Sequence, residues 1–358
     1  MPASLQSPEN KNSVNLDVLR SISVLMVIWW HLAYFLGYST WHGINIRSIG
    51  WLGVYFFFVH TTYVLMFSLN RINTQNNLFS TLCSFYCKRF FRIYPLSIFI
   101  VLLVAFFTLP GHISRPWDVV ESVESIRQII ANIFLIQNIT HHTDIIGPLW
   151  TLPIEVQMYI FLPFLYFLWK KPFGIIIIIG LWGWILLLKN YIWSLWSHLK
   201  VIQYFPIFSA GILGFLIYRK IIPKIRGIWF LCFILLLILI FFTGKIFIKW
   251  EVGIFVYLLL GCGLPFFQEI DWKYIRIVSH IFAKYSYTLY LIHNTCIWAA
   301  FEIGKVLPFY TQIFFFVLLL VVIPFWLYKI IEAPWIYYWK QIEQKIQQLF
   351  EKNKIFIH

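Results

Sequence analysis

Residues 18–38 read VLRSISVLMVIWWHLAYFLGY, an apolar run that contains one arginine, Arg20, and one histidine, His31. About 20 apolar residues in a helix cross the roughly 30 Å hydrocarbon core of a bilayer. The run therefore predicts a membrane-spanning helix. The residues before it are polar and no small-residue cleavage site follows it, so we expect the helix to remain in the mature protein.

Comparable apolar runs continue along the 358 residues of the chain, which are 61% hydrophobic, 21% aromatic and only 12% charged. A soluble domain carries about 25% charged residues, so this composition indicates a surface covered mostly by lipid. We predict an all-α polytopic membrane protein with about ten transmembrane helices plus one re-entrant or interfacial segment. The expected spans are residues 18–38, 51–69, 93–110, 149–168, 173–189, 201–218, 228–243, 252–268, 285–304 and 312–332.

The segment 128–146 is the exception, because polar residues interrupt it repeatedly. We interpret it as re-entrant or interfacial, which also leaves most of the 28 Lys and Arg residues on the inner side, as the positive-inside rule requires. The net charge of +14 is then a topology signal, and no nucleic-acid partner is expected. We expect a bacterial inner-membrane protein with both termini in the cytoplasm and membrane lipid as its surroundings.

The chemistry is expected within residues 1–334, which form the transmembrane domain. Residues 335–358 alternate apolar and polar side chains at helical spacing, which predicts a cytoplasmic amphipathic helix on the inner leaflet. The five cysteines lack the paired spacing of a zinc site, so no metal is expected.

Three segments carry candidate chemical groups. Arg20 and His31 lie eleven residues apart on one predicted helix, hence on the same face and about 16 Å apart along its axis. Ionisable groups inside a bilayer are costly and indicate function. Arg20 could hold an anion at the inner mouth while His31 accepts a proton deeper in the membrane. Alternatively, Arg20 anchors the helix and His31 bonds a neighbouring helix.

The second segment, FYCKRFFRIYP at residues 85–95, places three cations just before a predicted span. Arginine suits the geometry of phosphate groups and lysine adds a point charge. Lys88, Arg89 and Arg92 therefore form a candidate anion site on the same side as Arg20. Anchoring to the inner leaflet is the alternative.

The third segment, GPLWTLPIEVQMY at residues 147–159, carries a carboxylate inside a span. Helical rise places Glu155 about ten ångströms below the outer mouth, at a depth similar to that of His31. A carboxylate beside a histidine would fix its tautomer and raise its basicity, so we predict that Glu155 orients His31. A structural pair between Glu155 and a lysine remains an alternative.

Together these segments resemble acyltransferase family 3, membrane proteins that O-acylate polysaccharides and other envelope acceptors. Further matching segments are GWLGVYFFF at 50–58, YSYTLYLIH at 285–293 and EAP at 332–334, all in the order of the family. The chain departs from the family at Thr61-Thr62, where Ser-Gly is usual, which puts a close helix contact in doubt. It also has Lys88 in place of arginine and Thr151 in place of serine.

The resemblance implies an integral membrane O-acyltransferase. It would move an acyl group, expected to be acetyl, from cytoplasmic acyl-CoA to a hydroxyl of a cell-surface polysaccharide or lipopolysaccharide sugar. Arg20, Lys88, Arg89 and Arg92 would bind the coenzyme A phosphates. His31 would act as base or carry the acyl group itself, Glu155 would orient it, and Tyr159 would donate to the oxyanion.

Other residues have open roles. His293 matches a family motif and is a candidate for substrate binding, with a helix–helix hydrogen bond as the alternative. Glu332 would hold a helix end or pair with an inner-face arginine. Trp150 could stack on a sugar ring, as could Trp41, Trp51 and Trp117, although all four suit an interfacial belt. His141, with His142 and Asp144, could contact the acceptor or hold a metal.

Two other classes of function compete with an enzyme. A secondary transporter or lipid-linked sugar flippase would also bury ionisable groups, but the chain lacks an internal repeat. A sensor or scaffold would use the cations only as anchors. The oligomeric state is left open by the sequence.

Overall fold

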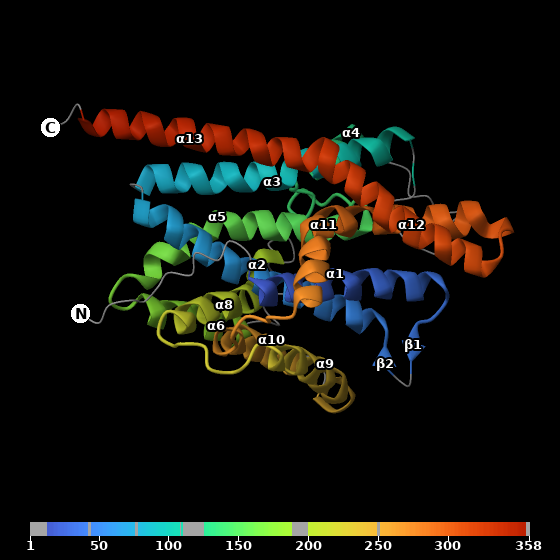
Figure 1. Ribbon diagram of the computed structural model, residues 1–358, viewed down its shortest axis with the longest axis horizontal. Coiled ribbons are helices and arrows are strands. Elements are labelled where there is room, and N and C mark those ends of the chain that lie inside the picture. The colour runs from blue at the N-terminus through green and yellow to red at the C-terminus, as the bar shows by residue number, and fades with distance from the viewer. Residues whose placement is uncertain are drawn as a thin grey trace.

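The computed structural model of the protein describes residues 13–41, 44–75, 78–107, 109, 125–187, 200–248 and 251–355 (Figure 1). Helices dominate this part of the chain. They are α1 Val14–Phe35, α2 Arg47–Gln75, α3 Leu78–Phe107, α4 Ile126–Ile133, α5 Thr151–Trp169, α6 Gly174–Leu187, α8 Lys200–Tyr218, α9 Trp229–Ile248, α10 Glu251–Gly263, α11 Lys273–Ile297, α12 Phe309–Leu327 and α13 Ala333–Ile355. Two antiparallel strands of two residues each, β1 Thr40–Trp41 and β2 Ile44–Asn45, lie between α1 and α2.

The predicted fold class is confirmed. In the described part of the chain, six helical segments are long and apolar enough to cross a membrane, and three shorter helices are apolar. Within the described residues each of the ten expected spans overlaps a helix, the ninth being α11 and the π turn Trp298–Glu302 that follows it. The protein is thus an all-α integral membrane protein, and the strands among its described residues are the short pair β1 and β2.

The segment 128–146 does not form a helix of membrane length. It consists of α4, eight residues long, and turns that lead to the 3-10 turn Gly147–Trp150. The Asn132 side chain donates to the carbonyl of Thr143 at 3.0 Å and accepts from the backbone N–H of Ile145 at 3.0 Å. The polar residue that interrupts the apolar pattern therefore folds the chain back on itself.

Small residues set how closely the central helices approach. A Cβ atom on Gly211 of α8 would lie 2.2 Å from Oγ1 of Thr62 and 2.4 Å from the carbonyl oxygen of Val59, both on α2. The close contact that Thr61-Thr62 put in doubt is therefore present, because α8 supplies the glycine instead of α2. Gly261 of α10 meets the backbone of Ala210 on α8 in the same way, with a Cβ distance of 2.2 Å.

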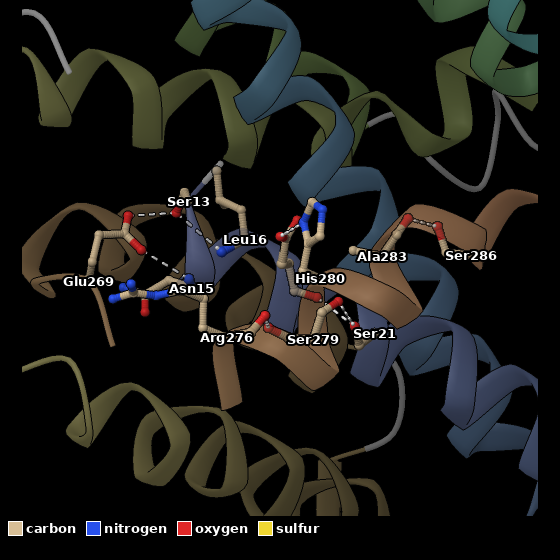
Figure 2. Close-up of polar contacts among 11 residues, drawn as sticks. Ser13, Asn15, Leu16, Ser21, Glu269, Arg276, Ser279, His280, Ala283 and Ser286 are labelled. Atoms are coloured by element: carbon tan, nitrogen blue, oxygen red, sulfur yellow. Dashed lines mark hydrogen bonds and ion pairs between the residues drawn. The ribbon is translucent and has the colours of Figure 1, made fainter. Parts of the chain in front are cut away.

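The first turn of α1 is hydrogen-bonded to residues 268–270, which lie far along the chain between α10 and α11 (Figure 2). Ser13 donates to the Glu269 carboxylate at 2.6 Å, and the backbone N–H of Asn15 donates to the same carboxylate at 3.1 Å. The buried Asn15 side chain donates to the carbonyl of Gln268 and accepts from the N–H of Ile270. We call these contacts, made with residues 268–270, the N-terminal clasp.

Helix α13 continues from α12 through the π turn Tyr328–Glu332 and lies alongside α3 at one edge of the bundle (Figure 1). Phe91 of α3 stacks on Trp335 and Trp339, with ring centroids 5.7 and 6.1 Å away. Trp339 is buried by this contact. The tail is helical, as its periodicity predicts, and its first turns pack on the transmembrane helices.

Candidate active site

Five helices line a partly open cavity of about 110 Å³. Helices α1, α2 and α11 are the most extensively packed of these, and α3 and α5 line the remaining sides. Hydrophobic side chains form much of the wall, and polar groups converge on it from every helix. The polar side chains that line it are Arg20, Ser23, His60, Thr61, Arg89, Arg92, Thr151, Glu155, Tyr159, Ser286, Tyr287 and Tyr290.

Three of the four predicted cations line this cavity. Arg89 and Arg92 lie three residues apart on α3 and therefore share a helix face, while Arg20 enters from α1. The Arg20 guanidinium lies over the Phe57 ring, 5.8 Å from its centroid. Lys88 points elsewhere and lies near the charges of Lys340 and Glu343 on α13.

The cavity cations carry unused hydrogen-bonding capacity. The Nε atoms of Arg20 and Arg89 are buried and have no hydrogen-bond partner within the described residues. Such groups cost about 1–3 kcal/mol each when nothing satisfies them. A bound anion with several oxygen atoms would remove that cost, which makes the cationic end a candidate site for phosphate groups.

Two glutamates are buried among the described residues, and they have different partners. Glu332 pairs with Arg92 and accepts from the Thr288 hydroxyl at 3.0 Å, so the predicted pairing of Glu332 with an arginine is present. Glu155 accepts from the Tyr159 hydroxyl at 2.8 Å, one turn along α5. Both side chains of this second pair face the cavity.

His31 lies just beyond the cavity and is paired with a second histidine. Its Nδ1 is 3.0 Å from Nε2 of His293 on α11 and 2.9 Å from the carbonyl oxygen of Val27. Val27 and Tyr290 line the cavity, each about one turn before the corresponding histidine, although neither histidine lines it. The Tyr290 hydroxyl bonds the Thr151 hydroxyl at 2.9 Å at this end.

This arrangement corrects one prediction and confirms another. The His31 ring contacts His293 and not Glu155, because Glu155 is held by Tyr159 on its own helix and faces the cations. Depth alone placed Glu155 near His31, but the rotation of α5 sends the carboxylate elsewhere. The helix–helix hydrogen bond considered for His293 is present.

Sequence reasoning gave no role to His60, which the structure places in the cavity wall. The residue is 7% exposed, and its Nδ1 has no hydrogen-bond partner in the described part of the chain. A signal was available, since His60 is an ionisable residue inside the predicted span 51–69.

Trp150 and His141, two candidates for acceptor binding, do not line the cavity. Trp150 packs in an aromatic cluster, with ring centroids 4.9 Å from Trp51 and 5.9 Å from Tyr204. His141 lies in an exposed turn with a φ of 60°. No three potential metal ligands come together among the described residues. Trp117 and the side chain of Trp41 lie outside the described residues.

Comparison with known proteins bears on this geometry. Residues 13–329 match the acyltransferase domain of acyltransferase family 3. Searches of the curated proteins and of the solved structures found no match. The matched range contains all five helices around the cavity and both histidines. The chain therefore belongs to acyltransferase family 3 and is a membrane acyltransferase.

Proposed function

We propose that the protein transfers an acyl group, acetyl, from cytoplasmic acyl-CoA to a hydroxyl of a surface polysaccharide or lipopolysaccharide sugar. The observation that carries this proposal is the cavity, which has three guanidinium groups in its wall and ends one helical turn from the histidine pair. Such a cavity would combine a site for phosphate groups with a site for proton transfer inside one membrane domain.

The donor is assigned to the cationic part of the cavity. Coenzyme A carries a diphosphate and a further phosphate, and guanidinium groups bind such oxygens in pairs. The unsatisfied Nε atoms of Arg20 and Arg89 supply donors for them, while Arg92 is already engaged with Glu332. Lys88 would act at most on the approach to the site, since it does not line the cavity.

The slender pantetheine arm would then extend along the cavity from Arg20 towards Val27. On α1 the residues Arg20, Ser23, Val24 and Val27 recur at helical spacing and form one stripe of the wall. His31 continues the same stripe by one turn, so a thioester carried past Val27 approaches the imidazole. The hydrogen bond between the Tyr290 and Thr151 hydroxyl groups lies at this end and would have to break when the thioester arrives.

His31 is the proposed general base. It takes the proton of the acceptor hydroxyl, and the oxygen attacks the thioester carbonyl. A C–O bond forms, the C–S bond breaks, and the departing thiolate of coenzyme A recovers the proton from the imidazolium. Glu155 and Tyr159 are hydrogen-bonded to each other in the cavity wall. The proposed role of Tyr159 is to position the acyl-CoA donor.

The experiment is acyl transfer by the purified protein in detergent or lipid. Radiolabelled acetyl-CoA and the surface glycan of a deletion strain are supplied, and label in the glycan is measured. The wild type is expected to transfer acetyl, and His31→Ala is expected to lose at least about 10²-fold in rate. Trp29→Ala is the control, because Trp29 is an exposed residue on the other face of α1.

The result that would overturn the proposal is equally specific. A folded wild-type protein that transfers no acetyl, but moves glycan across vesicle membranes, would be a transporter. Wild-type rates in a folded His31→Ala variant would remove the assignment of the base.

A further inference from the structure

The two histidines are connected to each other and to backbone carbonyl groups by short contacts. His293 is fully buried, and its ring centroid lies 4.7 Å from that of His31. Its Nδ1 is 2.7 Å from the carbonyl oxygen of Tyr290 and 3.2 Å from that of Leu289. The two rings therefore form a chain of close polar contacts that runs from α1 to the backbone of α11.

The carbonyl contacts determine where the protons sit. A carbonyl oxygen only accepts, so a ring nitrogen 2.7 Å from one must carry the hydrogen. His293 is then protonated on Nδ1, and its Nε2 is the accepting nitrogen. The same reasoning applies to His31, because its Nδ1 faces the carbonyl of Val27 and the accepting Nε2 of His293.

The chain of donors thus points in one direction. The Nδ1–H of His31 is directed to acceptors, the Nδ1–H of His293 donates to Tyr290, and the lone pair of a neutral His31 falls on Nε2. Any other arrangement of protons would set two lone pairs, or two N–H groups, against each other at about 3 Å. In this tautomer the basic nitrogen of His31 is Nε2, which is the atom that would take the proton of an acceptor hydroxyl.

We infer that His293 is a positioning residue for the acyl transfer, which holds His31 in the tautomer with its basic nitrogen on Nε2. The inference rests on the proposed role of His31 as base. When Nε2 takes the proton of the acceptor hydroxyl, the imidazolium keeps its Nδ1–H directed at Nε2 of His293, which stabilises the positive charge. Once the C–S bond has broken, the thiolate of coenzyme A takes the Nε2 proton and restores the starting tautomer.

His293 thus takes the position that the sequence suggested for Glu155. In serine hydrolases a buried carboxylate bonds the catalytic histidine and fixes its tautomer. Here the corresponding bond is made by a neutral side chain, which avoids burying an additional charge at this depth. The carboxylate of Glu155 remains available to the cavity, where it accepts from Tyr159.

Three substitutions at position 293 separate positioning from packing. His293→Leu keeps apolar volume and removes both polar contacts. His293→Asn can still donate near the place of Nδ1, but its amide is too short to reach His31. His293→Gln is long enough for its amide oxygen to accept from His31. The measurements are kcat and KM for acetyl-CoA, the pH dependence of kcat, and the melting temperature of each variant.

We expect His293→Leu and His293→Asn to lower kcat by about 10²-fold or more with an unchanged KM for acetyl-CoA, since the donor cavity is untouched. His293→Gln should recover kcat to within about tenfold of the wild type. The acid limb of the kcat profile should move in the Leu variant and return towards its original position in the Gln variant. Adding His293→Leu to His31→Ala should cause no further loss, because the two act as a unit.

Two outcomes would overturn the inference. One is a wild-type kcat in folded His293→Leu. The other is a Gln variant that falls as far as Leu, with equally lowered melting temperatures, because that pattern indicates packing alone. Failure of the proposed function is distinguishable, since the wild type itself would then transfer no acetyl from acetyl-CoA.

Discussion

Arg89 and Lys88 are adjacent in the chain, yet the structure gives them different surroundings. Arg89 lines the cavity with a buried Nε that has no partner in the described residues, whereas Lys88 lies towards α13. A hydrogen bond to a charged group contributes about 1.5–3 kcal/mol. We therefore predict that Arg89→Gln raises the KM for acetyl-CoA by about tenfold to a hundredfold. Lys88→Gln is the matched control, with a change of less than about threefold.

The measurement is initial acyl-transfer rate against acetyl-CoA concentration, at matched levels of folded protein. Equal effects at both positions would mean that the cations act only through a general positive field and not through contact in the cavity.

At the residue scale the sequence predicted which side chains matter better than it predicted their partners. Helical periodicity placed Arg20 and His31 on one face of the first span, and the structure has them on one stripe of α1. The pairing of His31 with Glu155 was wrong, because depth is a local property while helix rotation depends on packing. Whether these side chains carry the reaction remains a prediction.

At the scale of the elements, one glycine controls the approach of α8 to α2. A methyl group on Gly211 would meet Thr62 and a backbone carbonyl of α2 at less than 2.5 Å, so the helices would have to separate. We predict that Gly211→Ala lowers the melting temperature in detergent by several degrees, an effect of about 1–3 kcal/mol. Gly180→Ala on α6 is the control, because a Cβ atom there would meet nothing within 4 Å.

Melting can be followed by tryptophan fluorescence or by aggregation on heating. A Gly211→Ala variant as stable as Gly180→Ala would show that the α2–α8 contact relaxes without cost.

The elements themselves were largely predictable. An apolar run long enough to span a bilayer has few alternatives to a helix, since its backbone groups must be satisfied internally. The interruption of 128–146 by polar residues correctly indicated a segment that turns back, although only the structure reveals that Asn132 makes the turn. The small hairpin at residues 40–45 was not predicted, because two-residue strands leave no periodicity to detect.

At the scale of the whole molecule, the N-terminal clasp joins residues about 255 positions apart. Asn15 contributes two hydrogen bonds from a buried side chain to the backbone of residues 268–270. We predict that Asn15→Leu leaves a buried carbonyl and N–H unsatisfied and costs about 1–3 kcal/mol of stability. Acyl transfer well below the melting temperature should stay within about twofold, since Asn15 does not line the cavity.

The control is Arg276→Ala, which removes an exposed ion pair with Asp271 in the same region. Exposed pairs contribute little, so its melting temperature should match that of the wild type. An Asn15→Leu variant with unchanged melting would mean that the clasp does not hold the first helix in place.

The sequence by itself determined that the chain is an all-α membrane protein, where its spans lie, and that it resembles acyltransferase family 3. These follow from hydropathy, charge and ordered motifs, which are local properties of the chain. Only the tertiary structure decided that His293 and not Glu155 contacts His31. It also decided that His60 lines the cavity and Lys88 does not, and that Thr62 packs against Gly211. Those contacts depend on the rotation and packing of helices far apart in the chain, which no local pattern specifies.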